Sequence, residues 1–383
     1  MSSRASVTVV AAVALLLGCT STQDREQTAP AGEESSSSTA EAATVDPIDT
    51  AAVTRELDFT FGGPDPIYPT VMSVLVSQGG ELLIERYYDK DGRDSHDIAS
   101  VTKSVVSTLV GIAVDDGRLT LDQPLRELLP AYASSMSDEV AGLTLEQLLT
   151  MTAGLPADPD PLHGGGPLPF TASDDWVGRI LEDGPSSAPD DFAYSSASSH
   201  LLSAILTEAT GLPLLEYAED ELFAPLGIDT RGAITPMLEE NSRAYHRAYD
   251  RAPIAWSVDP AGLQTGWGYL KLRPREMLRL GQLVLQDGVW NGNTVVSRDW
   301  VEDATTNKLD VLDTDGVGYG YQWFTTEAGG RQAALAVGFG GQLIEVVPEQ
   351  DLVVVTTSEI VVPPVLDGGD LTEAVNEAVF SPR

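Results

Sequence analysis

Apolar residues recur every three or four positions along residues 98–119, which predicts a buried amphipathic helix. The apolar positions are Val101, Val105, Leu109, Ile112 and Val114. Ser100 stands at the start of this pattern and Gly117 at its end, and both residue types are typical of helix termini. Ser100 and Lys103 are therefore expected on one face of the helix, one turn apart.

Strand patterns stand near both ends of the chain. Two β-rich runs over residues 71–77 and 81–88 flank Gln78, Gly79 and Gly80, which is a hairpin signal. Four further strand-like runs cover residues 319–325, 332–337, 342–347 and 351–357. Because the turns between these four runs are short, we expect neighbouring strands to pair antiparallel.

Helical signals fill the middle of the chain. Thr144 and Gln147 form a capping-box pattern that opens a short helix ending before Gly154. Further helices are expected over residues 200–210, 274–286 and 371–380. Residues 155–193 are dominated by Pro, Gly and Asp, so we expect a long irregular segment over a cleft.

This order of elements favours an α/β (α+β) fold. It would hold one antiparallel sheet, formed from both chain ends and covered by helices, with an inserted, mainly helical subdomain. The active site is expected where the sheet and the subdomain meet.

The N-terminal residues differ from the rest of the chain. An apolar run over residues 7–17 is too short to span a bilayer and is followed by Leu16-Leu17-Gly18-Cys19. Residues 1–18 resemble a bacterial lipoprotein signal peptide, with Cys19 as the lipid-modified first residue of the mature chain. An ordinary secretory signal or an uncleaved anchor is the alternative.

The following residues, 19–54, are rich in Ser, Thr, Ala, Glu and Pro, which predicts a disordered tether. The folded domain is then expected over residues 55–383, lipid-anchored to a bacterial cell envelope through Cys19 and extracytoplasmic.

Composition narrows the function. The formal net charge of −36 argues against binding to nucleic acid or to anionic lipid head groups. Because Cys19 is the only cysteine, no intrachain disulfide can form and no other thiol is available for catalysis. No cluster has metal-ligand spacing, so neither a metal nor a cofactor is predicted. His200 is interpreted as a helix residue facing the core or the surface, and His163 is given no role.

Ser100 and Lys103 form an S-x-x-K pattern that suits nucleophilic catalysis. A serine at a helix N-terminus lies in the positive end of the helix dipole, and a nearby lysine can take its proton when burial favours the neutral amine. The alternative is a helix-capping serine followed by a surface lysine. The pair alone leaves both interpretations open.

The tetrad from Ser100 to Lys103, followed by Tyr194-Ser195-Ser196, resembles the serine β-lactamase and penicillin-binding-protein superfamily. The nearest resemblance is to class C-like serine hydrolases, which include esterases, D-amino peptidases and 6-aminohexanoate-dimer hydrolases. Residues 148–155, 266–269, 338–342 and 346–349 agree with that pattern. The resemblance covers about residues 68–360 and implies the same fold and a serine hydrolase activity.

The resemblance also implies roles for individual residues. Ser100 would attack a carbonyl and become acylated, and Lys103 would act as the base. Tyr194 matches the tyrosine of the family's Y-x-N motif and would pass the proton onward, although a core aromatic residue is the alternative. The backbone N–H groups of Ser100 and of Gln342, which follows Gly341, would form the oxyanion hole.

Two positions depart from the family's pattern. Ser196 replaces the asparagine of Y-x-N, and Phe339 stands where the family carries Lys or His. Loss of that cation disfavours a β-lactamase or a D-Ala-D-Ala carboxypeptidase and favours a small ester or amide substrate that is uncharged or anchored differently. A sensor-like domain that binds β-lactams or peptidoglycan, and is acylated without deacylating, is the alternative. A purely structural envelope protein is a third possibility.

Overall fold

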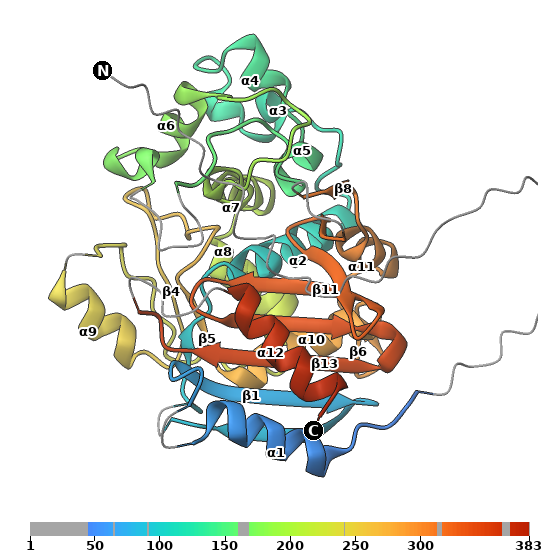
Figure 1. Ribbon diagram of the computed structural model, residues 1–383. Helices are drawn as coiled ribbons and strands as arrows, with labels where there is room; N and C mark the ends of the chain where they lie inside the picture. The colour runs from blue at the N-terminus through green and yellow to red at the C-terminus, as the bar shows by residue number, and fades with distance from the viewer. Residues whose placement is uncertain are drawn as a thin grey trace, which may run out of the picture.

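One antiparallel sheet organises the molecule (Figure 1). The computed structural model describes residues 45–63, 66–89, 92–159, 168–240, 242–311, 316–361 and 368–382. The eight-stranded sheet has the order β2-β1-β13-β12-β11-β10-β9-β8, so strands from the two chain ends lie side by side. Its strands are β1 Val71–Gln78, β2 Glu81–Tyr87, β8 Leu309–Asp310, β9 Gly318–Tyr319, β10 Phe324–Ala328, β11 Arg331–Gly338, β12 Gln342–Val347 and β13 Leu352–Ser358.

Helices cover both faces of this sheet (Figure 1). Helices α1 (Thr50–Phe61) and α12 (Gly368–Phe380) contribute to an apolar cluster with the strands on one face. On the other face α10 (Pro274–Leu285) packs on β12 and β13, and α2 (Val101–Asp115) packs on β11. The predicted fold class is confirmed.

The mainly helical subdomain lies beyond one edge of the sheet (Figure 1). It contains α3 Leu125–Leu128, η1 Pro130–Tyr132, α4 Asp138–Gly142, α5 Leu145–Leu149, η2 Pro169–Ala172, α6 Trp176–Asp183 and α7 Ser196–Thr210. The remaining helices are α8 Leu214–Ala218, η3 Glu219–Phe223, α9 Arg243–Arg251, α11 Arg298–Thr305 and η4 Pro348–Gln350. Two small sheets join β3 His96–Asp97 to β5 Leu270–Leu272 and β4 Ala255–Trp256, and β6 Val289–Trp290 to β7 Asn293–Thr294.

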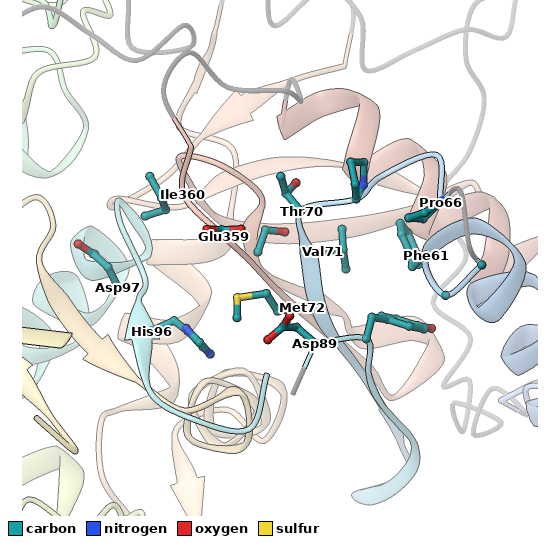
Figure 2. A pocket seen from close by; sticks show the side chains of 15 residues that line it. Phe61, Pro66, Thr70, Val71, Met72, Asp89, His96, Asp97, Glu359 and Ile360 are labelled. Carbon is teal, nitrogen blue, oxygen red and sulfur yellow. The ribbon is translucent and has the colours of Figure 1, made fainter. Parts of the chain in front are cut away.

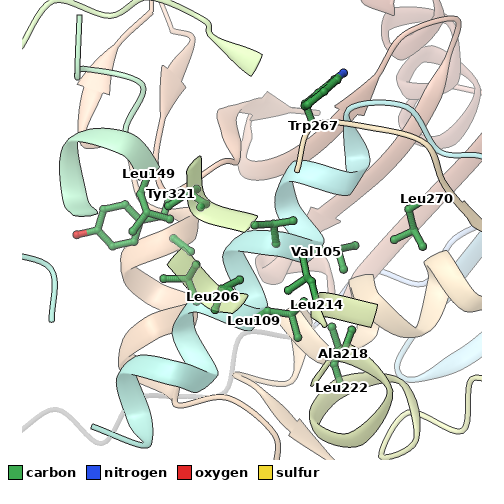
Figure 3. Packing of buried hydrophobic residues seen from close by; sticks show 14 of the residues in the cluster. Val105, Leu109, Leu149, Leu206, Leu214, Ala218, Leu222, Trp267, Leu270 and Tyr321 are labelled. Atoms are coloured by element: carbon green, nitrogen blue, oxygen red, sulfur yellow. The ribbon is translucent and has the colours of Figure 1, made fainter. Parts of the chain in front are cut away.

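Helix α2 forms the centre of the core between the sheet and the subdomain. Its residues from Val101 to Ala113 are all buried. Figure 3 shows Val105 and Leu109 of α2 among residues of α7, α8 and the segment before β5. A helix that is buried around its whole circumference is held firmly, so the residues at its N-terminus have a fixed direction.

Several predicted elements are confirmed, and four differ. Helix α7 begins at Ser196 rather than at His200, and the strand run over 319–325 is split by a turn at Gln322, whose φ is +61°. The interpretation of residues 155–193 as wholly irregular is wrong over α6, because Asp175 caps this helix and four of its residues are buried, namely Trp176, Val177, Ile180 and Leu181. Helix α1 begins inside the predicted tether.

The early start of α1 has a local cause. The side chain of Asp49 accepts hydrogen bonds from the first backbone N–H groups, and Val53, Leu57 and Phe61 repeat every four residues and are buried. Folded structure therefore extends before residue 55. No described helix is long and apolar enough to span a bilayer. Residues 1–18, Cys19 and His163 lie outside the described residues, so the lipid anchor stays a prediction.

Candidate active site

Ser100 is the N-cap residue of α2 and is partly exposed. The residue before it, Ala99, has a φ of +46°, a left-handed conformation that is uncommon for a residue with a Cβ. Ile98 is fully buried and anchors this turn from the core. Within the described chain the Ser100 N–H has no hydrogen-bond acceptor, so this donor is free to bind a ligand at the helix N-terminus.

Lys103 is buried beside Ser100, with 2% of its surface exposed. Its Nζ lies 3.0 Å from Ser100 Oγ, 3.3 Å from Ser196 Oγ and 3.3 Å from the carbonyl oxygen of Trp267. These oxygens accept all three N–H bonds of an ammonium group, whereas a neutral amine could accept the Ser100 proton instead. The interpretation of Lys103 as a surface lysine is wrong.

Ser196 is held by Asp158, a residue that the sequence analysis did not single out. The Ser196 hydroxyl donates to Asp158 Oδ2 at 2.6 Å, and the Ser196 N–H donates to Asp158 Oδ1 at 2.7 Å. Because its proton points to Asp158, the Ser196 oxygen presents its lone pairs to Lys103. No local pattern indicates this contact, since the two residues are separated by 38 positions.

Replacing Asp158 by Asn is expected to lower kcat about tenfold, because an amide has one acceptor oxygen for the two donors of Ser196 and loses a charge-assisted bond. Ester hydrolysis and thermal unfolding of the variant check this. Asp191→Asn changes an exposed aspartate within residues 155–193 and is the matched control. An unchanged kcat in Asp158→Asn would show that this carboxylate does not support the site.

Tyr194 lies against the lysine. Lys103 Nζ is 4.7 Å from the centre of the Tyr194 ring, and this ring stacks on Phe324 with centroids 6.1 Å apart. Tyr194 is partly exposed and also packs against a small apolar cluster around Tyr319. The structure therefore brings together Ser100, Lys103, Tyr194 and Ser196, as the sequence motifs predicted.

Gly338 brings the sheet to the nucleophile. A Cβ at this position would lie 2.5 Å from the Ile98 carbonyl oxygen and 3.3 Å from Ala99 Cβ, so only glycine allows the approach. Phe339 follows directly and is partly exposed. Its N–H, like that of Ser100, lacks a hydrogen-bond acceptor among the residues that the structure covers.

Gly341 and Gln342 make their contacts on the far side, toward β13 and α12. The Gln342 amide donates to the Ser358 carbonyl at 2.8 Å and accepts from the Ser358 N–H at 3.2 Å. The Gly341 carbonyl accepts from Thr356, and a Cβ on Gly341 would lie 2.5 Å from Leu371. Gly338, the last residue of β11, faces the peptide before Ser100.

His200 lies on α7, as interpreted from the sequence, and of the two orientations left open it faces the core, where it is fully buried. Its Nε2 lies 3.2 Å from Asp259 Oδ2. Rings of Phe170, Trp176 and Trp267 surround it at centroid distances of 6.1, 5.6 and 5.2 Å. This cluster fixes Trp267, whose carbonyl binds Lys103. Across the described ranges no group of His, Cys, Asp and Glu could hold a metal ion.

Comparison with known proteins shows the family of this chain. The family model described as Beta-lactamase matches residues 70–377, which span the sheet, α2 and the helical subdomain. The chain belongs to the beta-lactamase family.

Proteins with different names resemble this member of the beta-lactamase family. The 6-aminohexanoate-dimer hydrolase of Paenarthrobacter ureafaciens is 27% identical over 309 residues, which cover 74% of this chain and 71% of the relative. Esterase EstB of Burkholderia gladioli is 29% identical over 230 residues, or 54% of this chain and 59% of the esterase. The relatives thus include one protein named as a dimer hydrolase and one named as an esterase.

A solved structure shares the fold. A penicillin-binding protein homolog from Caulobacter crescentus superposes with a TM-score of 0.65 at 17% identity, covering 88% of this chain and 98% of that chain. This beta-lactamase family member therefore has the fold predicted from the motifs around Ser100 and Tyr194.

Proposed function

We propose that this beta-lactamase family protein cleaves a small ester or amide through an acyl-enzyme on Ser100, with Lys103 and Tyr194 transferring protons. The observation that carries the proposal is the buried lysine, whose Nζ is 3.0 Å from Ser100 Oγ. A buried ammonium is costly to maintain, so its place beside a partly exposed serine suits a group that exchanges protons with that serine.

The reaction takes place in two steps. The Ser100 oxygen attacks the substrate carbonyl while its proton moves to Lys103, and the leaving group departs with a proton passed through Lys103 and Tyr194. Water then attacks the Ser100 ester, its proton moves through the same groups to the departing Ser100 oxygen, and the acid is released with Ser100 restored. Tyr194 is suited to the relay because its ring lies beside Lys103 Nζ.

We also propose a different second donor for the oxyanion hole from the one inferred from the sequence. The N–H of Phe339 takes the place assigned to Gln342. Gly338 packs against the peptide before Ser100, and Phe339 follows it with a free N–H, whereas the backbone of Gln342 lies in the pairing of β12 with β11, opposite Gly338. Two N–H groups converging on one oxygen stabilise the charge that develops on the substrate carbonyl.

The substrate is a neutral or cationic ester or amide of small size. Phe339 supplies an apolar, partly exposed surface instead of a cation, and a net charge of −36 repels anionic substrates. The names of the two relatives point to an amide and to an ester, and both classes react through the same acyl-enzyme.

Hydrolysis of a short-chain nitrophenyl ester by the wild-type protein and by Ser100→Ala tests the proposal, with the intact mass recorded during the reaction. We expect turnover with a transient acyl adduct, and the loss of both in Ser100→Ala while the melting temperature is retained. A wild-type adduct that persists without turnover would favour the sensor-like alternative. Equal turnover in Ser100→Ala would contradict a serine mechanism.

A further inference from the structure

The backbone before the nucleophile is strained. Ala99 has a φ of +46°, and alanine adopts this conformation only where its surroundings impose it. The carbonyl of Ile98 and the Cβ of Ala99 both face Gly338 at close range, which leaves little room for another path. The direction of Ser100 therefore depends on what keeps Ala99 in this conformation.

Asp97 makes the contact that holds this turn. Its Oδ1 accepts a hydrogen bond from the Ala99 N–H at 2.8 Å, two residues further along the chain. This contact closes a turn directly before Ser100. Asp97 is itself fixed by strand pairing, since it lies opposite Lys271 where β3 pairs with β5. The bond thus connects the small sheet to the start of α2.

The carboxylate of Asp97 is enclosed, although part of the residue lines a cavity of about 440 Å³. Figure 2 shows the carboxylate pointing away from Met72 and Glu359, two other residues of the cavity wall. Burial raises the pKa of Asp97 to about 6, while the N–H groups of Ala99 and Tyr269 and the charge of Lys271 favour its ionised form.

The other titratable groups near Asp97 come from α9, β5 and the segment before β5. Burial, together with the charge on Asp97, raises the pKa values of Tyr245, Tyr249 and Tyr269, so these hydroxyls stay neutral. Lys271 is buried and donates to the carbonyls of Tyr249, Asp250 and Ala252 at 2.9, 3.0 and 3.2 Å. Burial lowers the pKa of Lys271, whereas the charges of Asp250, Asp97 and Asp94 favour its ammonium form. Glu240 accepts a hydrogen bond from the Tyr269 hydroxyl.

We infer that Asp97 is a positioning residue, which as a carboxylate holds Ala99 in its left-handed conformation and thereby directs Ser100 toward Lys103 and the substrate. This inference rests on the proposed function of Ser100 as the nucleophile. Asp97 touches neither the substrate nor the reacting atoms, so its loss should slow acylation and leave substrate binding nearly unchanged.

The test compares pre-steady-state acylation by a nitrophenyl ester in wild type, Asp97→Asn and Asp97→Ala. Asp97→Ala is expected to acylate about ten to a hundred times more slowly with little change in KM. Asp97→Asn, which retains an acceptor for the Ala99 N–H, should recover most of that loss. Asp94→Ala, an exposed neighbour, is the matched control and should acylate like wild type.

The pH dependence provides a second measurement. The ratio of the wild-type rate to the Asp97→Asn rate should fall from about pH 8 to about pH 5, because only the wild-type residue is neutralised in that range. Groups that ionise alike in both proteins cancel in the ratio. A ratio that stays constant would contradict a carboxylate role.

A double-mutant cycle tests whether Asp97 acts through the positive φ of Ala99. Glycine adopts positive φ without a Cβ penalty, so Asp97→Ala should cost less acylation rate in an Ala99→Gly background than in wild type. Equal losses in both backgrounds, or wild-type acylation in Asp97→Ala, would overturn the inference. Failure of the proposed function is distinct, because the wild-type protein would then show no more acylation than Ser100→Ala.

Discussion

Replacing Lys103 by methionine is expected to lower the acylation rate by at least about 10⁴-fold while the protein stays folded. Methionine fills a similar volume but cannot accept the Ser100 proton. The cost of burying an ammonium that is only 2% exposed disappears, so the melting temperature should stay the same or rise. Burst kinetics with a nitrophenyl ester and a thermal unfolding scan measure the two effects.

Lys308→Met is the matched control for this change. Lys308 is an exposed lysine that pairs with Asp303, so its replacement should leave acylation unchanged. If Lys103→Met acylated at the wild-type rate, another group would have to be the base. A large loss of stability in Lys103→Met would show instead that its contacts with Ser196 and Trp267 maintain the fold.

Replacing Glu345 by glutamine is expected to raise the free energy of unfolding by up to about 3 kcal/mol at about pH 8. Glu345 on β12 is fully buried under α12, accepts one hydrogen bond from Asn376 at 3.1 Å and has an Oε2 without a partner among the described residues. Burial raises its pKa from 4.5 to about 7. Glutamine keeps the bond to Asn376 and carries no charge.

The sign of the effect follows from the two pKa values. The unfolded chain releases the Glu345 proton near pH 4.5, but the folded protein retains it until about pH 7. The contribution of Glu345 to the free energy of unfolding is therefore most favourable below pH 4.5 and falls as the pH rises to 7. Urea unfolding should show a gain for Glu345→Gln at about pH 8 and little gain at about pH 4. Glu349→Gln changes an exposed residue and should leave the stability unchanged at both pH values. If Glu345→Gln and wild type were equally stable at about pH 8, a buried charge at this position would be contradicted.

Local signals explain how much could be predicted from the sequence. The periodic apolar residues of α2, the hairpin turn at Gly79 and Gly80, and the capping box of Thr144 each act within a few residues, and the structure has all three elements. The closeness of Ser100 and Lys103 could be predicted for the same reason, because a helix places residues three apart on one face.

Contacts between distant residues explain what could not be predicted. Asp158 contacts Ser196, the first residue of α7, although 38 positions separate them in the chain. The direction of the Gln342 side chain depends on the register of β12 between β11 and β13, and that register is not visible in a single strand pattern. Helix α6 was missed because its short apolar stripe lies among Pro, Gly and Asp residues.

The pairing of β1 with β13 also affects how the chain folds while it is being synthesised. Ser73 and Thr357 hydroxyls meet at 2.6 Å although 284 positions separate them. The hairpin of β1 and β2 is made early, yet its inner edge has no partner until the last strand leaves the ribosome. Throughout translation, an apolar strand edge is thus open to other chains, and a polypeptide that ends before residue 352 leaves it open permanently.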